Sequence, residues 1–302
     1  MRREKVKRSK ALNKQPIGVF DSGLGGLTTL KPLIERFPNE DFVYLGDTKR
    51  NPYGMHSEKV IIKYAKNDID FLIDKNCKFI ISACGTVSTV ALPVLKKELK
   101  MPLLSYNYKL ENLDKTSKYS VPIIGIVYTL VSNALKVTKN GKIGVMATTA
   151  TVKSKVFEQA FQSKRLDEIG NRDKNIEISS VACPLMVSLV EYGFRDSEVA
   201  KTVAKEYCKD LIKKNVDTVI LGCTHFPLLK DILQEILGKN VKLIIAGDGI
   251  ADYLDGFLKF NNLENNKDNI GTRKFYITDD ANFETEATLF FGEKIECEVV
   301  KL

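Results

Sequence analysis

The sequence predicts an α/β fold made of two similar doubly wound domains, with mainly parallel sheets and an active site in the cleft between them. Short runs of β-branched and aromatic residues alternate with longer amphipathic stretches, which is typical of strands followed by crossover helices. The same alternation starts again after a polar segment at 107–122, which ends in proline. With 302 residues, the chain is long enough for two medium-sized domains.

In the first half, each apolar run is short enough for a strand and precedes a stretch with helical periodicity. The strand candidates are IGVF at 17–20, DFVYLG at 41–46 and KFIISA at 78–83. The helix candidates that follow them lie at 27–37, 57–74 and 87–99. Strands and helices in this alternation form a parallel sheet covered on both faces.

The second half repeats this design, and the chain then closes with one further unit. Strands are expected at 123–127, 142–147, 177–182 and 217–222, and helices at about 151–165, from Leu185, at 196–214 and at 227–237. A strand at 242–247, a helix at 250–260, an Asn-rich loop at 261–269 and a strand at 275–278 complete the chain. We expect residues 16–106 plus 246–302 to form the first domain and residues 107–245 the second, after a basic tail at 1–15.

The net charge of +8 is concentrated in that tail. Residues 1–15 carry seven Lys or Arg and one Glu, a net charge of +6, which leaves +2 for the rest of the chain. The tail is expected to be a solvated, disordered extension, so nucleic acid is expected to make at most weak contacts with it. No apolar run is long enough to cross a bilayer and no apolar segment typical of a secretory signal follows the basic start, so a cytoplasmic location is expected.

The cysteines are expected to be reduced thiols without a metal. They lie at positions 77, 84, 183, 208, 223 and 297, and none shows the C-x-x-C spacing of a zinc or redox site. The chain has only two histidines, His56 and His225, so a metal centre is not expected.

Four loops of small and polar residues follow predicted strands, where open α/β sheets place their functional groups. They are DSGLGG, GDTKRNPYG, CGTVST and GCTHFP. The first lacks the G-x-G-x-x-G spacing of a nucleotide loop, and Asp21 would repel phosphate. This loop is therefore either a tight turn or a site that supplies the Asp21 carboxylate and the Ser22 hydroxyl.

Two of these loops begin with or contain a cysteine in the same position, at the end of a strand and before a probable helix. These are Cys84 and Cys223, and His225 stands two residues after the second. Taken alone, each of these cysteines would be expected to be buried and unreactive, as most free cysteines are. One thiol beside a histidine suggests acyl transfer, whereas two thiols facing one pocket suggest proton removal from one face of a carbon and return from the other. Glu191 is either solvated or functional.

The ordered motifs DSGLGGLTTL, GDTKRNPYG, CGTVST, ATTATVKS, ACPLMVSLVE, LGCTHFPLL and FYIT resemble the cofactor-independent aspartate/glutamate racemase family, most closely its glutamate-specific members. The likeness runs from about Ile17 to Gly292. It implies an isomerase that interconverts L- and D-glutamate for peptidoglycan synthesis in a bacterial cytoplasm. It also implies catalysis without pyridoxal phosphate, any other cofactor or a metal, and a possible homodimer.

The resemblance assigns roles to individual residues. Cys84 and Cys223 match the two catalytic cysteines, Asp21 matches a carboxylate that assists the first, and His225 and Glu191 match groups that assist the second. Asp47 matches a loop carboxylate of the family. The substrate-binding positions implied are Asp21, Ser22, Tyr53, Gly54, Gly85, Thr86, Thr224 and His225.

The chain departs from the family pattern at two places. Gly85 stands where the family usually has asparagine, and residues 147–151 read ATTAT where it usually has GTPAT. Loss of an amide that binds a charged amino acid favours an alternative in which the substrate is aspartate or another amino acid. A non-enzymatic alternative is a regulatory protein that keeps the racemase scaffold and binds nucleic acid through the basic tail.

Overall fold

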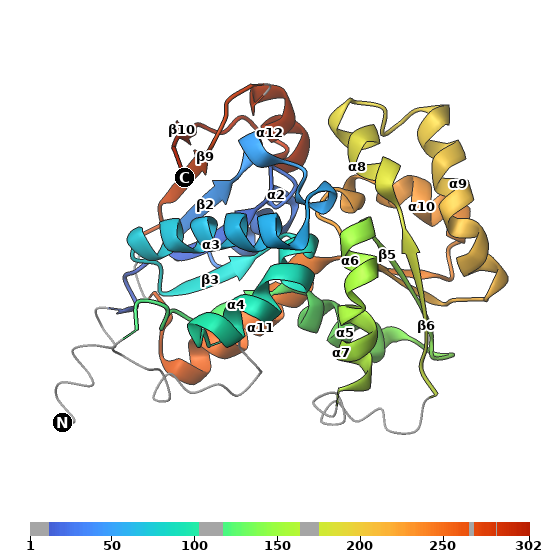
Figure 1. Cartoon of the computed structure of the whole chain (residues 1–302), viewed down its shortest axis with the longest axis horizontal. Helices are drawn as coiled ribbons and strands as arrows, with labels where there is room; N and C mark the ends of the chain where they lie inside the picture. Colours follow the sequence, from blue (N-terminus) through green and yellow to red (C-terminus); the bar gives the residue numbers. More distant parts are fainter. Residues whose placement is uncertain (1–11, 103–116, 164–174, 266–268, 282) are drawn as a thin grey trace.

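The computed structural model describes residues 12–102, 117–163, 175–265, 269–281 and 283–302 (Figure 1). Most of the basic tail, the expected boundary between residues 106 and 107, part of the polar segment at 107–122 and the middle of the Asn-rich loop lie outside these ranges. The expected division into two domains, with its boundaries, stays a prediction.

The described strands form two parallel sheets, as the fold class requires. The first has the order β10-β9-β2-β1-β3-β4. Its strands are β1 (Ile17–Asp21), β2 (Phe42–Gly46), β3 (Phe79–Ser82), β4 (Ile123–Gly125), β9 (Arg273–Ile277) and β10 (Glu298–Val299). The second has the order β6-β5-β7-β8. Its strands are β5 (Lys142–Ala147), β6 (Glu177–Ala182), β7 (Thr218–Leu221) and β8 (Lys242–Ile244).

Helices cover these sheets. The helices are α2 (Leu27–Arg36), α3 (Glu58–Asp74), α4 (Leu92–Leu99), α5 (Ile126–Val137), α6 (Thr149–Ser154), α7 (Val156–Gln162), α8 (Pro184–Glu191), α9 (Glu198–Lys213), α10 (Lys230–Leu237), α11 (Ala246–Asn261) and α12 (Phe283–Phe291). Helices α3 and α4 pack on one face of the first sheet, whereas α2 and α11 pack on its other face and against each other. Helix α11 also packs against α5, so a continuous apolar core runs from the first sheet to the second. No helix in the described ranges is long and apolar enough to cross a membrane.

The strand expected at 123–127 differs from the prediction. It ends at Gly125, where α5 begins, and it pairs with β3 at the edge of the first sheet. Only glycine fits at position 125, because a Cβ atom there would lie 2.7 Å from the Ser88 hydroxyl oxygen and would clash with it. The Ser88 hydroxyl also accepts a hydrogen bond from the Ile126 N–H, which fixes the turn into the helix.

Two helices also differ from their expected bounds. The helix expected at about 151–165 is two short helices, because Lys155 has a left-handed backbone conformation, with φ 57°. Thr148 caps the first of them by accepting a hydrogen bond from the Thr151 N–H. The strand expected at 242–247 ends at Ile244, and α11 starts at Ala246 rather than at residue 250.

Candidate active site

Cys84 and Cys223 line one small pocket from opposite sides. Cys84 follows β3 and Cys223 follows β7, each a strand in the interior of its sheet. The pocket has a volume of about 20 Å³, and both cysteines are among its lining residues. Parallel strands deliver their C-terminal loops to one edge of a sheet, so two sheets facing each other bring two such loops together.

The backbones of the two cysteine loops almost touch beside this pocket. A Cβ atom on Gly85 would lie 2.1 Å from the carbonyl oxygen of Gly222. That distance is far below any real contact, and the obstacle is backbone rather than a flexible side chain. Glycine at position 85 therefore allows the loop after β3 to approach the loop after β7.

The first cysteine lies in a buried, polar environment. The Cys84 thiol donates a hydrogen bond to the Ser22 hydroxyl, with a distance of 3.6 Å between sulfur and oxygen. Burial, together with the negative charge of Asp21, raises the pKa of Cys84 to about 12. At neutral pH this group is therefore a thiol, which can donate a proton.

Asp21 lies beneath the pocket and not directly on its surface. Its Oδ2 atom accepts hydrogen bonds from the N–H groups of Gly23 (3.2 Å) and Gly26 (3.0 Å), which hold the glycine-rich loop in place. The Thr224 hydroxyl donates to the other oxygen at 3.4 Å and so joins Asp21 to the second cysteine loop. Burial raises the pKa of this carboxyl, although the charge of His225 and these backbone N–H groups oppose the rise.

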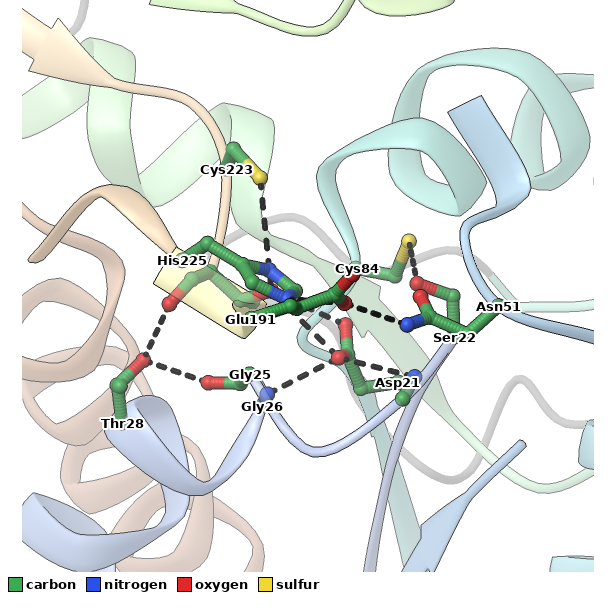
Figure 2. A network of polar contacts seen from close by, with 12 residues as sticks. Asp21, Ser22, Gly25, Gly26, Thr28, Asn51, Cys84, Glu191, Cys223 and His225 are labelled. Carbon is green, nitrogen blue, oxygen red and sulfur yellow. Dashed lines mark hydrogen bonds and ion pairs between the residues drawn. The ribbon is translucent and has the colours of Figure 1, made fainter. Parts of the chain in front are cut away.

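The second cysteine begins a chain of polar contacts. Cys223 Sγ lies 3.9 Å from His225 Nδ1, and His225 Nε2 lies 2.9 Å from Glu191 Oε1 (Figure 2). Burial opposes protonation of the imidazole, but the contacts with Cys223 and Glu191 outweigh it and raise the pKa of His225 to about 10. Burial also opposes ionisation of Glu191, yet His225 and the Asn51 amide lower its pKa. An imidazolium next to the sulfur is the partner that a thiolate base needs.

The loop between β2 and α3 contributes the next part of the pocket wall. Tyr53 is completely buried, and its hydroxyl donates to Asp47 and contacts Asp68 at 2.8 Å. Arg50 pairs with both carboxylates. The Tyr53 hydroxyl is thus bound inside the first half, and this network fixes the position of Gly54 at the pocket.

Threonine hydroxyls join the two halves next to the pocket. Thr86 and Thr148 lie 3.1 Å apart, and Thr89 donates to Thr151 at 3.3 Å. On the far side, the Thr28 hydroxyl donates to the Thr224 carbonyl at 3.0 Å. These contacts join the two halves on either side of the pocket.

The structure brings most of the sequence-predicted residues together. Those that line the pocket with the two cysteines are Ser22, Tyr53, Gly54, Gly85, Thr86, Thr224 and His225. The remaining three do not line the pocket, but each forms a hydrogen bond with a residue that does. Asp21 binds Thr224, Glu191 binds His225, and Asp47 binds Tyr53. Their roles in catalysis and binding stay predictions.

Five residues that line the pocket were not selected from the sequence, namely Asn51, Pro52, Thr148, Val187 and Gly222. Each lies inside a motif that was recognised, but the motif alone does not indicate which residues face the pocket. Asn51 and Thr148 are the two of these with a polar side chain. Among the described residues, no group of three or more His, Cys, Asp or Glu side chains is arranged to hold a metal ion.

Comparisons with known proteins agree with this geometry. A family model described as Asp/Glu/Hydantoin racemase matches residues 110–249. A glutamate racemase from Thermoanaerobacter pseudethanolicus is 38% identical over 287 residues, which cover 94% of this chain and 96% of that protein. One from Aquifex aeolicus is 38% identical over 281 residues, covering 93% and 95% of the two chains. The crystal structure of glutamate racemase from Francisella tularensis in complex with D-glutamate is 34% identical, covers 96% of this chain and 98% of that one, and has a TM-score of 0.79.

Proposed function

This chain belongs to the glutamate racemase family of amino-acid racemases, and we propose that it interconverts L- and D-glutamate by proton transfer between Cys84, Cys223 and the two faces of the α-carbon. It is therefore an isomerase. The observation that supports the two-cysteine mechanism best is the convergence of the two sulfur atoms on one pocket from opposite halves of the molecule.

In one direction, a Cys223 thiolate beside the His225 imidazolium removes the α-proton and becomes a thiol. The electron pair of the broken C–H bond stays on the α-carbon as a carbanion. The Cys84 thiol then gives its proton to the opposite face and becomes a thiolate, so the configuration is inverted. The reverse direction exchanges the two roles, and proton exchange with solvent restores the starting state. Each cysteine acts as a general acid or base.

The pocket must also stabilise negative charge on the carbanion. Hydroxyl groups of Ser22, Thr86, Thr148 and Thr224 face the same space as the sulfurs. Fixed donors in a nearly closed pocket stabilise developing charge without rearranging. We infer that these groups bind the substrate carboxylates, and that the product D-glutamate supplies peptidoglycan synthesis. The homodimer implied by the resemblance stays a prediction.

The test is racemisation by the purified chain without added cofactor. L-Glutamate in D₂O should lose optical activity and gain deuterium at the α-carbon, followed by circular dichroism and NMR. Cys84→Ser and Cys223→Ser should each lower kcat by about 100-fold or more, because general acid–base groups contribute about 10²- to 10⁴-fold. Cys297→Ser is the matched control, since this half-buried cysteine does not line the pocket.

A panel of amino acids in the same assay separates the glutamate proposal from the alternative substrates. Faster turnover of aspartate or a neutral amino acid would contradict glutamate as the substrate. Wild-type turnover in Cys84→Ser or Cys223→Ser would contradict the two-base mechanism.

A further inference from the structure

Asn51 joins the two halves of the molecule at the edge of the pocket. It lies in the loop between β2 and α3, and its Nδ2 atom donates a hydrogen bond of 2.6 Å to Glu191 Oε1 at the end of α8. Because an ionised carboxylate only accepts hydrogen bonds, this contact fixes which end of the amide faces Glu191. The amide nitrogen points to Glu191, so the carbonyl oxygen points away from it (Figure 2).

That carbonyl oxygen has no partner in the structure. Asn51 Oδ1 is buried and forms no hydrogen bond with any described residue. The side chain packs over Gly23, where a Cβ atom would lie 3.0 Å from Asn51 Cγ. A buried carbonyl oxygen without a donor is unfavourable, so its presence in a native protein calls for an explanation. At the edge of a pocket, a ligand that donates a hydrogen bond is one such explanation.

The chemistry of the pocket wall shows what such an oxygen could bind. Among the described lining residues, Asn51 has the only side-chain amide, and Gly85 offers no side chain at all. The Ser22 hydroxyl, which accepts a hydrogen bond from Cys84, can donate its own proton to a substrate carboxylate, whereas both ring nitrogens of His225 already contact Cys223 and Glu191. The α-ammonium group needs acceptors instead, and a carbonyl oxygen is an acceptor that cannot donate.

We propose that Asn51 is a substrate-binding residue whose carbonyl oxygen accepts a hydrogen bond from the α-ammonium group of the amino acid, while its amide nitrogen holds Glu191. This inference rests on the proposed racemase function. It assigns a specific acceptor to the ammonium group and links substrate binding to the Glu191–His225–Cys223 chain.

Two variants distinguish the role of the amide nitrogen of Asn51, a donor, from that of its carbonyl oxygen, an acceptor. Asn51→Leu removes both the donor and the acceptor, whereas Asn51→Asp removes the donor but keeps an acceptor oxygen in the same place. Both should therefore show a lower kcat through loss of the contact with Glu191. Only Asn51→Leu should raise KM for glutamate, by about 10-fold or more, as expected for a lost hydrogen bond to a charged group.

Glutarate is the probe that isolates the ammonium group, because it has both carboxylates of glutamate and no amino group. Its inhibition constant should change by less than about twofold between the wild type and Asn51→Leu. Glutarate already lacks the ammonium group that Asn51 is proposed to bind, so removing the Asn51 side chain costs glutarate no further contact. Thermal unfolding of both variants checks that they are folded.

An equal rise of the glutamate KM in Asn51→Leu and Asn51→Asp would overturn the proposal, as would a parallel weakening of glutarate and glutamate in Asn51→Leu. Calorimetric binding of the same two compounds gives an answer that does not depend on turnover. If the wild type fails to racemise glutamate, the proposed function fails, but the comparison of an amino acid with its deamino analogue still tests Asn51.

Discussion

At the scale of single residues, Gly85 shows how a sequence difference acquires a physical meaning. From the sequence it indicates an amide that the family usually has and this chain lacks. In the structure it is the place where the backbones of the two cysteine loops meet, next to Gly222. Asn51 provides an amide to the same pocket from another loop. We therefore expect the substrate preference of the chain to depend on both positions.

Gly85→Ala should impair catalysis more than folding. The added methyl group must push the Cys84 loop away from Gly222, and a displacement of about 1 Å at a catalytic group can cost about 100-fold in rate. We expect a decrease of this order in kcat for glutamate racemisation. Gly256→Ala in α11 is the control, because a Cβ atom there meets nothing within 4 Å. An unchanged kcat in Gly85→Ala would show that the close approach is unimportant.

At the scale of elements, the sequence predicts where the strands lie better than it predicts which strands pair with each other. Continuous buried runs identify β1, β2, β3, β5 and β7 because both faces of these strands are covered. It does not predict that residues 123–125 join the first sheet, since pairing with β3 depends on the space that Gly125 leaves for Ser88. It also does not predict the break at Lys155, a left-handed residue without a glycine signal.

In the loop between β2 and α3 as well, the sequence predicts which residues lie at the site but not the contacts that depend on tertiary packing. The resemblance implies that Tyr53 is a substrate-binding residue, and Tyr53 does line the pocket. The sequence does not indicate that the Tyr53 hydroxyl binds Asp47 and Asp68. Asp68 lies in α3, and its role depends on the packing of that helix under the loop. Burial and the neighbouring Asp47 raise the pKa of Asp68 well above its usual range.

Tyr53→Phe should therefore destabilise the protein. It removes the donor that two buried carboxyl groups share, and an unsatisfied buried group costs about 1–3 kcal/mol of the free energy of unfolding. Urea denaturation followed by circular dichroism measures this cost. Tyr64→Phe is the matched control, because the Tyr64 ring packs against Tyr53 and its hydroxyl has no hydrogen-bond partner among the described residues. Equal stability of the two variants would contradict the role of the network.

At the scale of the whole molecule, the pocket is too small for its proposed substrate. A volume of about 20 Å³ holds one or two water molecules, since one water needs about 10–15 Å³ in this measure. Glutamate is much larger, so we expect the two halves to separate for it to enter. The contacts that must break on this side are the threonine pairs, Thr86 with Thr148 and Thr89 with Thr151. Motions of this kind gate substrate entry in many enzymes.

A reversible crosslink between the two halves, next to the pocket, tests this requirement. The Thr89 and Thr151 hydroxyls lie 3.3 Å apart on opposite halves, so cysteines at these positions are close enough to form a disulfide after small rotations. The oxidised Thr89→Cys/Thr151→Cys variant should lose glutamate turnover, and a reductant should restore it, because only the closed arrangement allows the bond. The wild type, given the same oxidant and reductant, corrects for direct oxidation of Cys84 and Cys223. If the disulfide forms, as mass spectrometry would show, and turnover persists, then the substrate enters without separation of the halves and the pocket must enlarge by side-chain movement alone.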